Sequence, residues 1–257
     1  MPMRYISVFL IIFAFSLSTS AECQIKRSNP APFNRKADMA LRAAAEFENK
    51  LSDSSVTLDQ AIANWRLTAA DPDVKADTNS FAIALGSEGL LQLQKGNKMI
   101  ADSLLGKAMP LFRRKMAMAP FIVQYAELER SLNKNAMAMK AYFQIINTMD
   151  SIGQLWDIEF YRLSGYAPYA YAIDACFGIE QIAKKDTTYR KGGIQLLASA
   201  MNRHPLDALG MMAVVALHRI GAMTDDSYKY HVDLLSSRKP ELRSVCDVFE
   251  KRFSEVK

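Results

Sequence analysis

Glycine, proline, cysteine and histidine are all scarce in this chain of 257 residues, with 11, 9, 3 and 3 copies respectively. Few glycines and prolines leave few helix breakers, and the abundant residues are Ala, Leu, Met, Lys and Glu, which favour helices. No segment shows the alternation typical of a strand, and the apolar run 212–217 lies inside a longer helical pattern. The sequence therefore predicts an all-α fold.

Sequence motifs of common catalytic and nucleotide sites are also missing, including GxSxG, HExxH, CxxC, GxGxxG and the P-loop. The histidines His204, His218 and His231 have no cysteine or carboxylate at the spacing of a zinc site. Glu127 and Glu129 are two residues apart, so on a helix they point to different sides. We expect no enzymatic activity, no cofactor and no metal site.

Charge of one sign is not concentrated along the sequence. The 32 Lys and Arg residues exceed the 27 Asp and Glu residues, which gives a formal charge of +5. The basic residues are scattered, with short clusters such as residues 113–115. This pattern is typical of a solvated surface and does not indicate nucleic-acid binding.

The N-terminus has the features of a secretory signal peptide. Arg4 precedes an apolar stretch at residues 6–17, which is too short to span a membrane, and small residues follow. Cleavage after Ala21 or after Cys23 fits the pattern. Lipid anchoring at Cys23 is not expected, because the preceding residue, Glu22, is not small. We expect an exported protein, periplasmic or secreted, without a transmembrane helix in the mature chain.

After the signal at residues 1–23, the polar residues 24–36 suggest a flexible lead-in, and a helical pattern then continues from residue 37. Five segments share one design, in which a helix and a short polar turn precede a second helix and a terminator. The predicted second helices are residues 58–72, 99–109, 136–150, 191–205 and 226–240.

Each predicted second helix contains a small or medium residue followed four positions later by a bulky one. Three of the units then end at a proline, which stops a helix. The pairs are Ala61 and Trp65, Ala101 and Leu105, Ala138 and Tyr142, Gly193 and Leu197, and Tyr228 and Val232.

This pattern resembles the tetratricopeptide repeat (TPR), whose second helix carries an A-x3-F step and ends near a proline. The second unit matches best, with Gly89, Ala101 and Ala108 where two helices must approach closely. The resemblance covers residues 37–240 and implies an α-solenoid of about five helical hairpins. The intervals between successive small residues are 40, 37, 55 and 35 residues, whereas the family period is about 34.

The 55-residue interval contains an extra segment, residues 151–171, in which aromatic residues including Trp156 and Tyr161 cluster. One interpretation is an additional helix that packs onto the array. The other is an aromatic-lined surface for a small ligand or glycan, since insertions in repeat proteins often lie on the binding face.

The final segment, residues 241–257, carries apolar residues on one helical face and charges on the other. A helix of this kind can cap the end of a solenoid. Each repeat contacts only its neighbours, so Cys176 in the fourth unit and Cys246 in the cap are not expected to form a disulfide.

An array of helical hairpins offers an extended groove for a peptide or a partner protein. The resemblance implies that first-helix residues line this groove, although their apolar members would also fit the core. Our main hypothesis is an exported, non-enzymatic protein that binds another protein or assembles an envelope complex. The predicted binding residues are Leu90, Leu93, Gln94, Val123, Glu127, Arg130 and, for the aromatic segment, Trp156 and Tyr161.

Two Met-x-Met pairs, in KMAMAP (115–120) and NAMAMK (135–140), raise the question of a copper(I) site. Residues two apart on a helix lie about 200° apart around its axis, so Met137 and Met139 cannot bind one ion while this segment is helical. We expect Met139 to pack beside Ala138 and Met137 to be more exposed.

Overall fold

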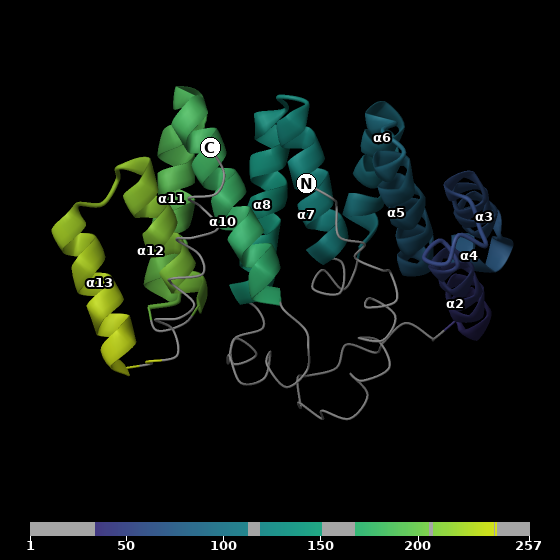
Figure 1. Ribbon diagram of the computed structural model, residues 1–257, viewed down its shortest axis with the longest axis horizontal. Helices are drawn as coiled ribbons and strands as arrows, with labels where there is room; N and C mark the ends of the chain where they lie inside the picture. Colours follow the sequence, from purple (N-terminus) through teal and green to yellow (C-terminus); the bar gives the residue numbers. More distant parts are fainter. Residues whose placement is uncertain (1–33, 113–118, 151–167, 206–207, 239, 241–257) are drawn as a thin grey trace. The chain divides into compact units, whose positions relative to one another are not determined.

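The computed structural model describes residues 34–112, 119–150, 168–205, 208–238 and 240. These residues form eleven α-helices and one short 3₁₀ helix without any strand, which confirms the all-α prediction (Figure 1). The predicted signal peptide, the Met116 and Met118 pair and the predicted cap at 241–257 lie outside the described residues. The chain divides into two compact units, residues 1–121 and 122–257.

The first unit contains five α-helices and the 3₁₀ helix. They are α2 (Arg35–Asn49), α3 (Leu58–Ala70), α4 (Pro72–Ala76), α5 (Thr78–Gln94), α6 (Lys98–Ala108) and η1 (Met109–Leu111). Helix α5 is the central element, because α2, α3, α4, α6 and η1 all pack against it. Gly96, at φ +91°, supplies the left-handed residue of the turn that reverses the chain between α5 and α6.

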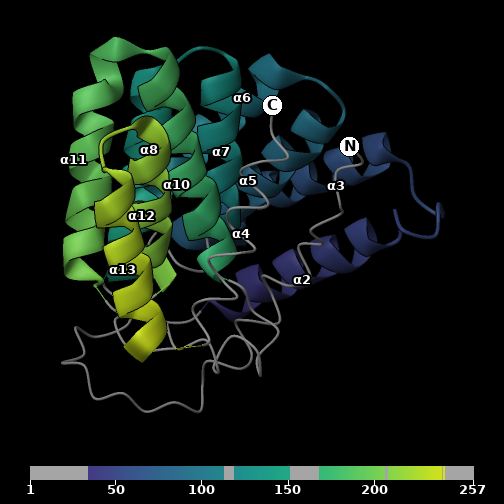
Figure 2. The same ribbon diagram turned by 60° about the vertical axis from the view of Figure 1, so that its left-hand side comes forward.

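The second unit contains most of α7 and all of the remaining helices. They are α7 (Ala119–Ser131), α8 (Asn135–Asp150), α10 (Pro168–Lys185), α11 (Thr187–Arg203), α12 (Ala208–Ile220) and α13 (Asp225–Arg238). Figures 1 and 2 show α10, α11 and α12 side by side. Helix α10 packs on α8, α11 and α12, and α12 also packs on α11 and α13. From α8 onward, each helix therefore packs on the next described helix in the sequence.

Local sequence signals explain where several helices begin. Thr57 and Gln60 form a reciprocal capping box at the start of α3. The side chains of Asp77 and Asp186 accept hydrogen bonds from backbone N–H groups at the starts of α5 and α11. Helix α2 begins at Arg35, after the cap Asn34 and two residues before the predicted start.

The predicted second helices all correspond to helices of the structure, namely α3, α6, α8, α11 and α13. The two residues of the predicted packing step are buried in the first four of these helices. Those with 0% exposure are Ala61, Trp65, Ala101, Leu105, Ala138, Tyr142 and Leu197. In α13 the bulky residue Val232 is buried, whereas Tyr228 is only partly so. Tyr228 occupies the place of a small residue, so the packing of this helix differs.

Small residues on first helices permit close approach. A Cβ added to Gly89 would lie 2.9 Å from Cγ of Leu105, which confirms the predicted contact between α5 and α6. Gly86 lies beneath the ring of Phe121, and Gly178 lies beneath the ring of Tyr142. Helix α6 ends at Ala108, and the 3₁₀ helix η1, which contains Pro110, follows directly.

The NAMAMK segment is helical, and its two methionines behave as predicted. Met139 is 8% exposed and packs in the core, whereas Met137 is 43% exposed. The two side chains therefore have different environments on α8, as expected for residues about 200° apart around a helix axis.

Candidate functional site

The predicted groove residues of α5 lie in its last two turns. Leu90 and Leu93 are partly exposed and Gln94 is exposed, whereas most residues from Ser80 to Gln92 are buried. These three side chains are thus available to a partner at the end of α5.

The predicted groove residues of α7 fall into two groups. Val123 is 2% exposed, so its side chain belongs to the core and cannot contact a partner in this conformation. Glu127 and Arg130 are partly exposed and form an ion pair with each other. Glu127 also accepts a hydrogen bond from the hydroxyl of Tyr142 on α8. Both polar residues are predicted groove residues, and the structure brings them into one cluster with Tyr142.

Tyr142 connects this cluster to the core of the second unit. Its ring packs on Gly178 of α10, where an added Cβ would lie only 2.0 Å from the ring. Burial, followed by the charge of Glu127, raises the pKa of Tyr142 well above its usual value, so the hydroxyl stays protonated and acts as a donor. The tyrosine therefore fixes the orientation of Glu127 and, through it, of Arg130.

The aromatic segment cannot be placed in the same way. Trp156 and Tyr161 lie outside the described residues, so the alternative of a small-ligand or glycan surface stays a prediction.

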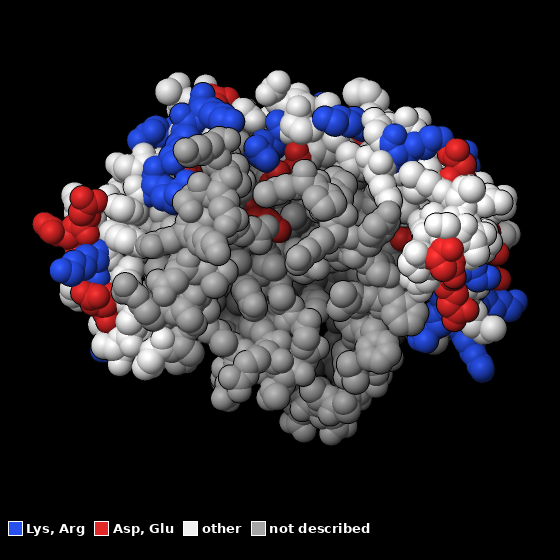
Figure 3. Space-filling model, viewed as in Figure 1, with Lys and Arg blue, Asp and Glu red and all other residues white. Residues whose placement is uncertain are grey.

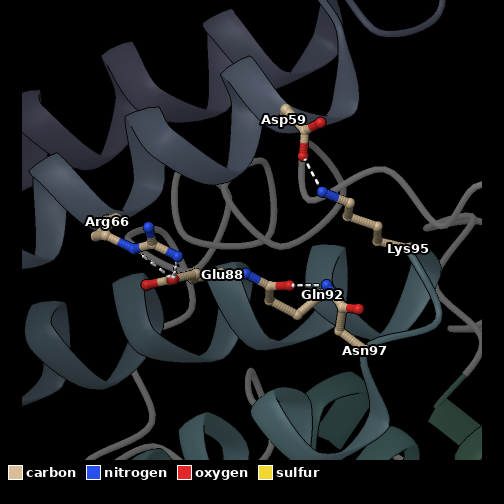
Figure 4. Close-up of polar contacts among 6 residues, drawn as sticks. All are labelled: Asp59, Arg66, Glu88, Gln92, Lys95 and Asn97. Atoms are coloured by element: carbon tan, nitrogen blue, oxygen red, sulfur yellow. Dashed lines mark hydrogen bonds and ion pairs between the residues drawn. The ribbon is translucent and has the colours of Figure 1, made fainter.

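A second polar network joins α3 to α5 in the first unit, as Figure 4 shows. The Nε and Nη2 atoms of Arg66 donate to Oε1 of Glu88 at 3.0 and 2.8 Å. The side chain of Glu88 is 5% exposed and that of Arg66 is 62% exposed, so the arginine covers a carboxylate that is otherwise enclosed. Lys95 at the end of α5 pairs with Asp59 at the start of α3.

A similar arrangement occurs in the second unit. Glu180 of α10 is fully buried, and its Oε1 accepts from Nε of Arg219 on α12 at 3.0 Å and lies 2.6 Å from Nζ of Lys184. Glu88 on α5 and Glu180 on α10 are thus both buried, and each is paired with an arginine of another helix. A buried charge of this kind needs its partner, because an unpaired charge in the core is costly.

A further acid, Glu48 at the end of α2, is partly buried and forms no ion pair with a described residue. Its Oε2 accepts a hydrogen bond of 2.7 Å from Nε1 of Trp65, the bulky residue of the repeat step in α3. Burial raises the pKa of Glu48 to about 7, and the Trp65 hydrogen bond only partly opposes this shift. The carboxyl group consequently changes its charge near neutral pH.

None of these three acids was singled out from the sequence, although a signal for Glu88 exists, because it is the only charged residue of α5. One acid inside an otherwise uncharged, apolar helix predicts burial with a compensating cation. Glu180 gives a weaker signal, because α10 also contains Asp174 and two lysines. For Glu48 no such signal exists, because its partner Trp65 is recognisable only once α2 and α3 are packed.

The histidines occupy structural positions. His218 Nε2 lies 2.7 Å from Oδ1 of Asp225, and its ring stacks on Tyr228 with a centroid separation of 4.2 Å. His204 ends α11 and is buried. His231 contacts the edge of the Tyr230 ring. No group of three or more His, Cys, Asp or Glu residues in the described ranges is arranged to hold a metal ion.

Cys176 is a free thiol in the core of the second unit, and burial raises its pKa to about 12. None of the described helices is both long enough and apolar enough to cross a membrane. Comparisons with protein-family models, with curated proteins and with solved structures find no match for the chain.

Proposed function

We propose that this chain is an exported, non-enzymatic protein of TPR-like helical hairpins that binds another protein or a peptide, including as part of an envelope assembly. The observation that carries the proposal is the recurrence of one packing step along the chain. A small and a bulky residue, four positions apart, are buried together in α3, α6, α8 and α11. Repeated helical pairs of this kind are typical of solenoids whose role is binding.

The partner is proposed to contact first-helix residues that remain accessible. In the first unit these are Leu90, Leu93 and Gln94, and in the second unit Glu127 and Arg130. The second group is suited to recognition, because Tyr142 holds Glu127 and the guanidinium of Arg130 is left partly exposed beside it. Preorganised polar groups lose little side-chain freedom when a partner binds.

Affinity capture tests this proposal. The tagged full chain would be expressed in its native host, and captured proteins would be identified by mass spectrometry. Leu93→Asp and Arg130→Glu are expected to abolish capture of a partner that the unchanged chain retains. Met99→Asp is a matched control, because Met99 is 67% exposed on α6 and lies outside the proposed contact residues.

Two results would count against the proposal. If every captured protein is retained equally by both variants, the first-helix residues are not the binding surface. If the chain captures no protein but its tryptophan fluorescence changes on titration with oligosaccharides, the alternative function of the aromatic segment is favoured.

A further inference from the structure

One edge of the second unit is formed by two turns, the α7–α8 turn and the α10–α11 turn. Nδ2 of Asn135, the first residue of α8, donates to Oδ2 of Asp186 at 3.0 Å. Asp186 also caps α11 by accepting from the N–H of Thr188 at 3.0 Å. One aspartate thus ties the start of α8 to the start of α11 and fixes the two turns beside each other.

Six cations lie in or near these two turns. Lys134 precedes α8 and Lys140 follows in its second turn, Lys184 and Lys185 end α10, and Arg190 and Lys191 lie near the start of α11. We refer to these six residues as the basic edge. Its two glutamates are buried, and its aspartate is partly exposed. Glu129 and Glu180 are 1% and 0% exposed, and the Asp186 carboxylate is engaged by Asn135 and the α11 cap. Blue side chains accordingly gather over the upper parts of α10 and α11 in Figure 3.

Three lysines of the basic edge, Lys140, Lys185 and Lys191, are exposed and form no ion pair with any described residue. Lys134 and Lys184 pair with the buried acids and remain 44% and 38% exposed. The surface that an approaching molecule meets is therefore positive, although the buried acids reduce its net charge.

The chemistry of these cations favours one kind of partner. The one arginine of the basic edge, Arg190, donates from Nη2 to the carbonyl of Ile220 at 2.7 Å. The accessible groups are thus lysines, which are flexible point charges and lack the planar fork that recognises carboxylates in pairs. Met137, 43% exposed, lies between Lys134 and Lys140 in sequence and adds a large apolar side chain to the same region.

We propose that the basic edge docks onto the surface of an anionic lipid bilayer. Lys140, Lys185 and Lys191 would lie against headgroup phosphates, and Met137 would enter the interface between headgroups and acyl chains. Clusters of four to eight basic residues attract anionic lipids, and an apolar side chain beside them strengthens the contact. This inference concerns the two turns, the end of α10 and the starts of α8 and α11, and it stands independently of the proposed partner surface on α5 and α7.

Vesicle co-sedimentation with the full chain tests the inference. One set of vesicles contains phosphatidylcholine alone, and the other has a third of it replaced by phosphatidylglycerol. We expect clearly stronger binding to the anionic vesicles, weakened by salt, because each lysine near the surface contributes about 1 kcal/mol. Lys185→Glu combined with Lys191→Glu should reduce the anionic partition coefficient at least tenfold, roughly the effect of losing two such lysines. Met137→Ser should reduce it by a smaller factor.

The matched control combines Lys229→Glu with Arg238→Glu. Both residues are exposed on α13, so this variant has the same change in net charge at another surface of the same unit. Any contribution of the apolar residues 6–17 is common to all variants and cancels in the comparison. Circular dichroism verifies that each variant is folded.

The inference is overturned if both double variants lose binding equally, since the effect would then be one of net charge alone. Equal binding of the unchanged chain to neutral and anionic vesicles would also overturn it. The third contrary result is that the chain binds polyglutamate and does not bind vesicles, and that the Lys185 and Lys191 changes abolish the binding to polyglutamate. In that case the basic edge binds an acidic protein.

Discussion

The partly buried carboxyl of Glu48 makes the stability of the first unit depend on pH near neutrality. Its pKa is 4.5 in the absence of structure and about 7 in the folded chain, where burial disfavours the charged form. Trp65 is its hydrogen-bond partner, and Arg66, the residue after Trp65, pairs with Glu88 instead. Thus no described cation compensates the negative charge when the proton leaves.

The sign of the effect follows from the raised pKa. Below about pH 4.5 both states hold the proton, so the stabilisation from this group is fully present. As pH rises towards 7, the unfolded chain loses the proton first and the folded state becomes less stable. At about 1.4 kcal/mol per pH unit, the difference between 4.5 and about 7 corresponds to roughly 3 kcal/mol of unfolding free energy.

Glu48→Gln isolates this contribution, because glutamine keeps an acceptor for the Trp65 N–H and does not titrate. Urea unfolding would be followed by Trp65 fluorescence in a Trp156→Phe background at about pH 5 and about pH 8, on either side of the Glu48 pKa. The parent chain should lose roughly 2 to 3 kcal/mol more unfolding free energy than Glu48→Gln between the two values.

Glu46→Gln provides the control on the same helix, because Glu46 is exposed. It should leave the pH dependence of the parent chain unchanged. The reasoning about Glu48 is refuted if Glu48→Gln and the parent chain lose the same unfolding free energy between the two pH values.

Three further predictions concern the second unit. Arg219→Leu should lower the unfolding free energy by roughly 2 to 4 kcal/mol, because Glu180 loses its arginine, and adding Glu180→Leu should restore part of the loss in urea unfolding. Gly178→Ala should destabilise by about 1 to 3 kcal/mol through its clash with Tyr142, and a Tyr142→Leu background should reduce that cost in thermal unfolding. Cys176 should react with a thiol reagent only as the unit unfolds, and fast labelling at Cys176 itself in the native protein, located by peptide mass spectrometry, would contradict its burial.

The helical architecture was predictable because the signals that determine it are local. The step from Ala101 to Leu105 combines helical spacing with a difference in side-chain size, and both are visible in the sequence. Burial of these residues then follows, since a helix with one apolar face must cover it. The same reasoning gave the environments of Met137 and Met139 on α8.

The polar contacts were less accessible to sequence reasoning, because their partners are distant along the chain. Arg219 lies 39 residues from Glu180, and Arg66 lies 22 residues from Glu88. Spacing on a helix cannot reveal such pairs. Val123 shows the same difficulty, because alignment with a repeat assigned it to the groove whereas packing of the second unit buries it.

The buried acids also limit how the two surfaces of the second unit can be used. Glu180 holds Arg219 and Lys184, so a partner that recruited either cation would leave a carboxylate unpaired in the core, which is costly. Arg130 and Lys185 do not neutralise a buried carboxylate. Glu127, the partner of Arg130, is partly exposed, and Lys185 makes no ion pair with a described residue. We therefore expect binding to involve cations that are not paired with a buried carboxylate. Arg130 is such a cation on the proposed partner surface, and Lys185 is one on the basic edge.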